Sequence, residues 1–237
     1  MPPTPRTLLV IGSGPGIGVH VAAEFAKRGF TKIALVSRTA EQLSVDKMAV
    51  LQAAGSTGVL ASVYTFQCDI GDSARLKQML DEVKELGAIE CVFFNAARVG
   101  PSRFFDFPVE AFEEDFNTTN LALYTTAAVL TPSLISRAAS SPNSKPSFLV
   151  TNSMLYKTPM PSLFSLSVVK AAQRSLVRCL SQVYEKDGVH FGLVSVEGAV
   201  SESSPNCNPK NIADKTWNLY NQERGDWTLE VELPDKS

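Results

Sequence analysis

The sequence predicts an α/β fold, a doubly wound parallel sheet with helices on both faces. Three observations lead to this prediction. Apolar, strand-like runs alternate with helical patterns along most of the 237 residues. The strands are continuous runs of Val, Ile, Leu and Phe, as a sheet covered on both faces requires. A glycine-rich turn at 12–18 follows the first strand. A chain of this length is short for two cores, so we expect a single domain over 1–237.

The N-terminal part alternates strands and helices in order. Strands are expected at 7–12, 32–38 and 63–70, where the apolar runs lie. Helices are expected between and after them, at 16–29, 41–55 and 72–87. Gly29 and Gly55 are the predicted stops of the first two helices, and Asp72 or Ser73 is the predicted N-cap of the third.

The C-terminal part continues the pattern. Strands are expected at 91–97, 148–154 and 191–198, with a helical region over 110–139 and a polar connector at 140–147. The weak alternation at 226–233 predicts an added edge strand. From about residue 199 we expect a short lid and this edge strand, which would leave the substrate pocket open.

The net charge, the apolar runs and the cysteines argue against nucleic acid, membranes and metal ions as partners. The 22 basic and 24 acidic residues give a net charge of −2, which provides no electrostatic attraction for nucleic acid or an anionic membrane. No apolar run reaches the roughly 18–20 residues that span a bilayer. The four cysteines are scattered without zinc-ligand spacing, so we expect no metal and free thiols in a reducing, cytoplasmic compartment.

The turn GSGPGIG predicts a dinucleotide cofactor. It follows a strand and opens a helix, as in Rossmann-type folds, so the helix N-terminus offers N–H donors to a pyrophosphate. Gly12 permits the tight turn, Gly14 and Gly16 permit close approach of the phosphates, and Gly18 permits close packing of helix on strand. Ser13 and Ile17 complete the predicted cofactor loop.

The end of the second strand predicts which dinucleotide binds. An NAD site places an acid there to accept from the ribose 2′-hydroxyl, whereas this chain has Ser37 and Arg38. A guanidinium can pair with a 2′-phosphate, and the neighbouring sequence holds no acid that would repel it. We therefore expect NADP(H) in preference to NAD(H).

Taken together, these motifs resemble the short-chain dehydrogenase/reductase family over about residues 7–200. The GSGPGIG turn is similar to its T-G-x-x-x-G-I-G loop, with Ile11 in place of the threonine. The resemblance implies adenine contacts from Asp69 and Ile70 and further cofactor contacts from Asn95, Ala96 and Ala97. It also implies contacts from Gly198 and Val200 in a segment that binds the nicotinamide carboxamide.

The resemblance also implies a catalytic set. Asn120 matches an asparagine that holds a proton-relay water, and Ser153 matches a substrate-orienting serine. Lys170 matches the lysine of the Y-x-x-x-K motif, which contacts the cofactor ribose. The tyrosine of that motif is replaced by Leu166, which has no exchangeable proton. Glu197 departs from the family pattern as well, because it stands where the carboxamide-binding segment has proline.

The missing tyrosine leaves three functions open. The chain is an oxidoreductase of a small carbonyl, enone or imine whose proton comes from elsewhere, with Tyr156 as the candidate donor and Arg98 as a group that could polarise a carbonyl. Alternatively it is a non-redox isomerase or cyclase on the same fold, or a protein that senses NADP(H) without catalysis. Members of the family commonly pair through the helix that carries Lys170, so a homo-oligomer is expected.

Overall fold

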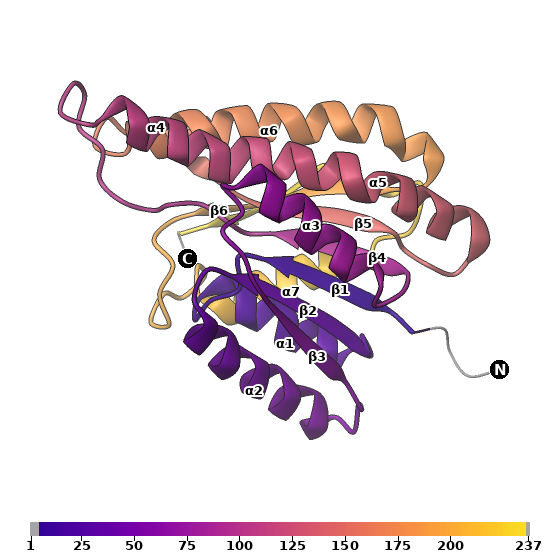
Figure 1. Cartoon of the computed structure of the whole chain (residues 1–237). Helices are drawn as coiled ribbons and strands as arrows, with labels where there is room; N and C mark the ends of the chain where they lie inside the picture. The colour runs from indigo at the N-terminus through magenta and orange to yellow at the C-terminus, as the bar shows by residue number, and fades with distance from the viewer. Residues whose placement is uncertain (1–4, 236–237) are drawn as a thin grey trace.

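The computed structural model describes residues 5–235, which build a seven-stranded, fully parallel sheet covered by helices on both faces (Figure 1). The strand order is β3-β2-β1-β4-β5-β6-β7. The strands are β1 Thr7–Ile11, β2 Lys32–Ser37, β3 Ser62–Gln67, β4 Ile89–Phe94, β5 Ser147–Ser153, β6 His190–Glu197 and β7 Glu230–Pro234. The predicted doubly wound fold is confirmed; residues 1–4 and 236–237 of the predicted domain lie outside the described residues.

The helices form two layers, one on each face of the sheet. One layer holds α1 Ile17–Lys27, α2 Ala40–Ser56 and α7 Pro209–Tyr220, and the other holds α3 Ser73–Lys84, α4 Val109–Phe116, α5 Ala122–Ser140 and α6 Phe164–Tyr184 (Figure 1). Each layer closes its own apolar core. Phe25, Phe30 and Trp217 pack in the first, and Leu130 and Phe148 pack in the second. The five inner strands β1, β2, β4, β5 and β6 are buried between these cores, which explains their unbroken apolar runs.

The predicted helix ends agree with the structure at two of three positions. Gly29 follows the last turn of α1 with φ +90°, and Asp72 caps α3 by accepting from the N–H groups of Ala74 and Arg75. The stop at Gly55 is wrong. Helix α2 continues to Ser56, and Gly58 adopts the left-handed conformation, with φ +76°.

The region expected to be one helix over 110–139 has a defect at its centre. Helices α4 and α5 are joined by a π-helical turn over Asn117–Leu121, and Asn120 lies in that turn. Such turns widen a helix and are frequent at functional sites. Pro132 lies inside α5 without ending it.

The C-terminal region confirms the predicted edge strand, because β7 pairs in parallel with β6 at the edge of the sheet. Before it, α7 packs in the layer of α1, where Phe25 meets the Trp217 ring edge-on at a centroid distance of 5.1 Å. In the region from about residue 199, where a short lid was predicted, residues 199–208 form no helix or strand. Within the described residues, no helix combines the length and hydropathy that a membrane crossing needs.

Candidate functional site

The strand order reverses between β1 and β4, and a crevice forms at such a reversal beyond the carboxyl ends of the strands. A cavity of about 340 Å³ lies there. Of the predicted cofactor-binding residues, nine line it: Gly12, Ser13, Ser37, Arg38, Asp69, Ile70, Asn95, Ala96 and Ala97. Gly14, Gly16, Ile17, Gly18, Gly198, Val200 and Lys170 are not part of its lining.

Two glycines of the turn are required by packing. Gly12 has φ +89°, and a Cβ on it would lie 2.8 Å from the backbone nitrogen of Ala96. A Cβ on Gly18 would lie 2.5 Å from the Gly12 carbonyl oxygen. Any side chain at these two positions would therefore push α1 or β4 away from the turn.

The other two glycines of the turn face open space. A Cβ on Gly14 or Gly16 would meet nothing within 4 Å. Helix α1 begins directly afterwards with Gly16 as its N-cap, and no side chain caps the first N–H groups. A glycine backbone with open space beside its Cα atoms, next to a helix start without a side-chain cap, fits a pyrophosphate, so the residues present suit a dinucleotide.

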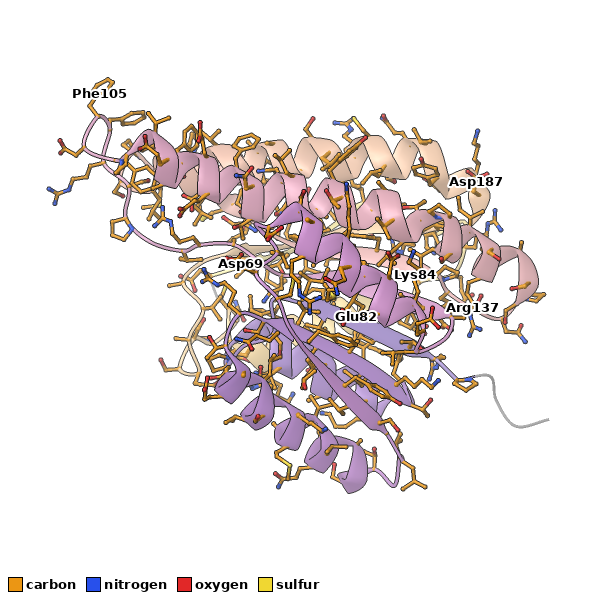
Figure 2. The ribbon with its side chains drawn as sticks, in the orientation of Figure 1. Asp69, Glu82, Lys84, Phe105, Arg137 and Asp187 are labelled. Atoms are coloured by element: carbon orange, nitrogen blue, oxygen red, sulfur yellow. The ribbon has the colours of Figure 1, made fainter. Side chains whose placement is uncertain are left out.

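The adenosine side of the cavity is formed by the ends of β2 and β3. Asp69, in the turn between β3 and α3, accepts a hydrogen bond at Oδ1 from the Gly71 N–H at 3.0 Å (Figure 2). Arg38 is exposed, and its carbonyl oxygen accepts from Gln67 Nε2 at 3.0 Å. Among the described residues no carboxylate forms an ion pair with the Arg38 guanidinium, so that group is available to a ligand phosphate.

A buried acid stands behind the glycine turn, and the sequence reasoning missed it. Asp46 of α2 is only 1% exposed and accepts at Oδ2 from Ser13 Oγ, at 2.5 Å. The signal was present in the helix pattern. Asp46 shares the buried stripe of α2 with Leu43, Val50 and Ala54, and an acid in an apolar stripe needs a polar partner.

Asn95 ties together three neighbouring strand ends at the cavity. Its Nδ2 donates to the Gly12 carbonyl oxygen at 3.0 Å, and its Oδ1 accepts from Thr151 Oγ1 at 2.8 Å. These bonds link the ends of β1, β4 and β5. Ala96 and Ala97, which follow, leave the cavity floor without bulky side chains.

The predicted catalytic lysine is buried next to the end of β5. Lys170 Nζ donates to the Thr151 carbonyl oxygen at 2.7 Å and to Gln173 Oε1 at 3.0 Å. No carboxylate pairs with it within the described part of the chain, and burial lowers its pKa to about 7. Asn120 is also buried, and its Oδ1 and Nδ2 have no hydrogen-bond partner among the described residues. Two orphaned polar atoms in the π-helical turn fit the water-holding role that the resemblance implies.

Leu166 occupies an apolar cluster one turn before Lys170. It is 4% exposed and packs with Leu155 and Val169, with Ala97 and Phe116 beside them. Ser153, at the end of β5, is half-buried and accepts at Oγ from the Leu155 N–H at 3.0 Å. Ser153 lies two residues before Leu155 in the chain, and the side chains of the apolar cluster itself have no proton to give.

Tyr156 does not line the cavity at the β1–β4 crevice. Its hydroxyl donates to Glu230 Oε2 at 3.1 Å, and the Arg174 guanidinium lies 4.4 Å from its ring centroid. Burial and the adjacent Glu230 raise the pKa of Tyr156. Its ring lines a second, apolar cavity of about 350 Å³ on the outer side of α6, with Met160 and Phe164. The structure thus does not bring Tyr156 together with Asn95 and Ala97.

Ion pairs of Lys157 fix the end of β6, where the predicted carboxamide-binding segment begins. Glu197 accepts from Lys157 Nζ at 3.2 Å, and Lys157 also pairs with Glu232. Gly198 packs against Asp235 so closely that a Cβ would lie 2.5 Å from the Asp235 Cγ. Val200 is 41% exposed.

Arg98 and its ion-pair partner Asp115 both line the cavity. Its Nε and Nη2 donate to Asp115 at 2.7 and 2.8 Å, and the guanidinium lies 4.9 Å from the Phe107 ring centroid. Asp115, which is buried on α4, also accepts from Ser165 Oγ on α6. Sequence reasoning placed Arg98 near substrate but did not find Asp115, its partner 17 residues away.

A comparison with known protein families assigns the chain to a family. The family profile described as short chain dehydrogenase matches residues 6–210. The chain belongs to the short-chain dehydrogenase/reductase family. The predicted resemblance is thereby confirmed at the level of the family.

Curated relatives match this short-chain dehydrogenase/reductase over part of their length. Levodione reductase from Leifsonia aquatica is 33% identical over 110 residues, which cover 46% of this chain and 38% of that protein. Short-chain dehydrogenase/reductase 3 from Bos taurus is 28% identical over 131 residues, 55% of this chain and 41% of that protein. The matched stretches therefore cover less than half of each relative.

Solved structures agree over nearly the whole chain. An alcohol dehydrogenase from the archaeon Thermococcus sibiricus, complexed with 5-hydroxy-NADP, has a TM-score of 0.82 at 20% identity and covers 97% of this chain and 96% of that one. An NADPH-bound short chain oxidoreductase from Pseudomonas aeruginosa PAO1, described as containing an atypical catalytic center, has a TM-score of 0.82 at 18% identity, covering 97% and 95%. At these identities the likeness shows the fold alone.

Proposed function

We propose that the chain is an NADP(H)-dependent oxidoreductase with a non-standard active site that reduces a small organic carbonyl, enone or imine. The observation that carries the cofactor assignment is the free Arg38 guanidinium at the cavity that Gly12, Asp69 and Asn95 also line. A guanidinium without a protein partner at this point favours a 2′-phosphate. Membership of the family supports the oxidoreductase class.

Some residues of the site would bind the cofactor and substrate, and others would exchange protons. When bound, the nicotinamide supplies the hydride. The glycine turn and the α1 N-terminus would hold the pyrophosphate. Ser153 would orient the substrate, and Lys170 would hold the nicotinamide ribose and, with a pKa near 7, exchange a proton at neutral pH. Asn120 would fix a water between Lys170 and solvent.

Leu166 sets the class of substrate that such a site can reduce. General acid catalysis typically contributes on the order of 10²–10⁴-fold, and the apolar cluster around Leu166 offers no acid. An enone or iminium needs less proton assistance than a simple ketone. The absence of an acid in this cluster also favours two alternatives to an oxidoreductase. One is a non-redox isomerase or cyclase, and the other is a protein that senses NADP(H) without catalysis.

The experiment follows NADPH oxidation at 340 nm across a panel of ketones, enones and imines. We expect turnover with an enone or an imine and little with simple ketones. Binding of NADPH without turnover on any member of the panel would contradict the oxidoreductase proposal and favour the two alternatives.

The variant Leu166→Tyr tests the role of the apolar cluster directly. The larger side chain must enter a packed site, so we expect a loss of about 1–3 kcal/mol in the free energy of unfolding. If the rest of the catalytic set is in place, we also expect ketone reduction to rise by on the order of 10²-fold. Leu166→Phe is the matched control, because it adds the ring without the hydroxyl. Equal activity of the two variants would show that the hydroxyl contributes nothing.

A further inference from the structure

Asp46 is a buried acid whose carboxylate contacts the cofactor loop. Ser13 Oγ donates to its Oδ2 at 2.5 Å, and Gln42 Nε2 donates to its Oδ1 at 2.7 Å. No cation forms an ion pair with Asp46 among residues 5–235. Any charge on this carboxylate is therefore balanced by two neutral donors alone.

The bond to Asp46 decides what Ser13 can offer to a ligand. Ser13 lines the 340 Å³ cavity together with Ser37 and Arg38. A hydroxyl has a single proton, and that of Ser13 is given to Asp46. Toward a ligand the Ser13 oxygen can therefore only accept, which suits a ribose hydroxyl and not a phosphate oxygen.

Arg38, which lines the cavity, and Asp46, which is buried behind Ser13, have opposite effects on a ligand phosphate. Arg38 attracts a 2′-phosphate, whereas a carboxylate behind Ser13 repels a phosphate dianion across the low-dielectric turn. A ribose with a free 2′-hydroxyl meets the Ser13 acceptor and no such repulsion.

We propose that Asp46 is a positioning residue for cofactor choice. It orients Ser13 toward a free ribose 2′-hydroxyl and limits the preference for NADP(H) that Arg38 provides, so the protein binds NADH as well as NADPH. This inference rests on the proposed function, since it concerns the same dinucleotide site.

The test measures the dissociation constants of NADH and NADPH by calorimetry for the wild type and for Asp46→Asn. Removing the negative charge is expected to raise the ratio Kd(NADH)/Kd(NADPH) about tenfold or more, a change of about 1.4 kcal/mol in relative affinity. Val50→Ala is the matched control. It loosens the same buried stripe of α2 without changing charge, so it is expected to leave the ratio within about twofold of the wild type.

Ser13→Ala keeps the proposal testable if Asp46→Asn fails to fold. It removes the acceptor but leaves the carboxylate, so NADH is expected to lose more affinity than NADPH and the ratio rises again. An unchanged ratio in the folded variants, or an equal shift in Val50→Ala, overturns the proposal and leaves the proposed function standing. Failure of the wild type to bind either dinucleotide overturns the proposed function and this inference with it.

Discussion

At the scale of the residue, the buried Lys170 amine links the site to the pH dependence of folding. Its pKa is lowered to about 7 by burial, whereas an exposed lysine titrates near 10.4. Between these values the unfolded chain binds one more proton than the native chain, so this group makes the free energy of unfolding rise with pH. Below pH 7 both states are protonated, so the free energy of unfolding no longer changes with pH through this group and the full cost of burying the charged amine is present.

The variant Lys170→Met tests this linkage. It keeps the length of the side chain and removes the titration. Between pH 7 and 8.5 we expect the free energy of unfolding of the wild type to rise by about 1.5 kcal/mol relative to the variant. Urea unfolding at several pH values measures the difference, and parallel pH profiles of the two proteins would show that Lys170 stays protonated when folded.

Single positions also show what the sequence could and could not predict. Gly12, Asn95 and Lys170 were predicted as site residues because their order along the chain matches a family pattern. The structure places Gly12 and Asn95, but not Lys170, in the lining of the cavity. Asp46 and Asp115 were not found, because their roles depend on contacts with Ser13 and Arg98 that helix packing creates. Where the Tyr156 hydroxyl lies could not be predicted either, since its partner Glu230 belongs to a strand 74 residues later.

At the scale of the element, Asp115 joins α4 to α6 and to the segment after β4. It accepts from Arg98 and from Ser165, and it is buried while Arg98 is 40% exposed. Replacing it with Asn removes the charge that holds both donors. We expect Asp115→Asn to lower the free energy of unfolding by about 2 kcal/mol, less than for a fully buried pair because solvent reaches Arg98.

Chemical denaturation of Asp115→Asn beside Glu113→Gln checks this prediction. Glu113 lies on the same helix but is exposed, so its substitution is expected to change stability by less than about 0.5 kcal/mol. Equal effects of the two substitutions would mean that the Arg98–Asp115–Ser165 cluster does not anchor the element.

Element boundaries were predicted unevenly, for physical reasons. Strands β1, β2, β4, β5 and β6 are inside the sheet, and their continuous apolar runs made them easy to place. Helix α2 passes Gly55 because a glycine costs only about 1 kcal/mol inside a helix. The π-helical turn at Asn117–Leu121 leaves no comparable mark in a helical pattern.

At the scale of the whole molecule, the outer surface of the α5–α6 layer carries exposed apolar side chains. Leu121, Tyr124 and Val168 are 54%, 59% and 43% exposed, on the layer that runs along the top of Figure 1. Phe105, fully exposed, stands at the tip of the loop that precedes α4 (Figure 2). Exposed apolar side chains favour association. Membership of the family leads us to expect pairing through α6 and not through α2, which also exposes Val45.

We therefore expect a homodimer in solution. Light scattering after size-exclusion chromatography should give twice the mass of 25.6 kDa for the wild type. Val168→Glu should shift the protein toward the monomer. Val45→Glu is the control, because Val45 is 63% exposed on α2, in the other layer. A monomeric wild type, or a dimer whose mass does not change in Val168→Glu, would contradict this assignment of the surface.

The proposed function of this protein requires that NADP(H) binds at the β1–β4 crevice with its 2′-phosphate beside Arg38. Calorimetric titration of the purified protein with NADPH and NADH, repeated with Arg38→Gln, tests this most directly. We expect saturable NADPH binding that weakens about tenfold in Arg38→Gln, while the affinity for NADH stays within about twofold. The absence of a binding isotherm for both dinucleotides at millimolar concentration would contradict the proposed function.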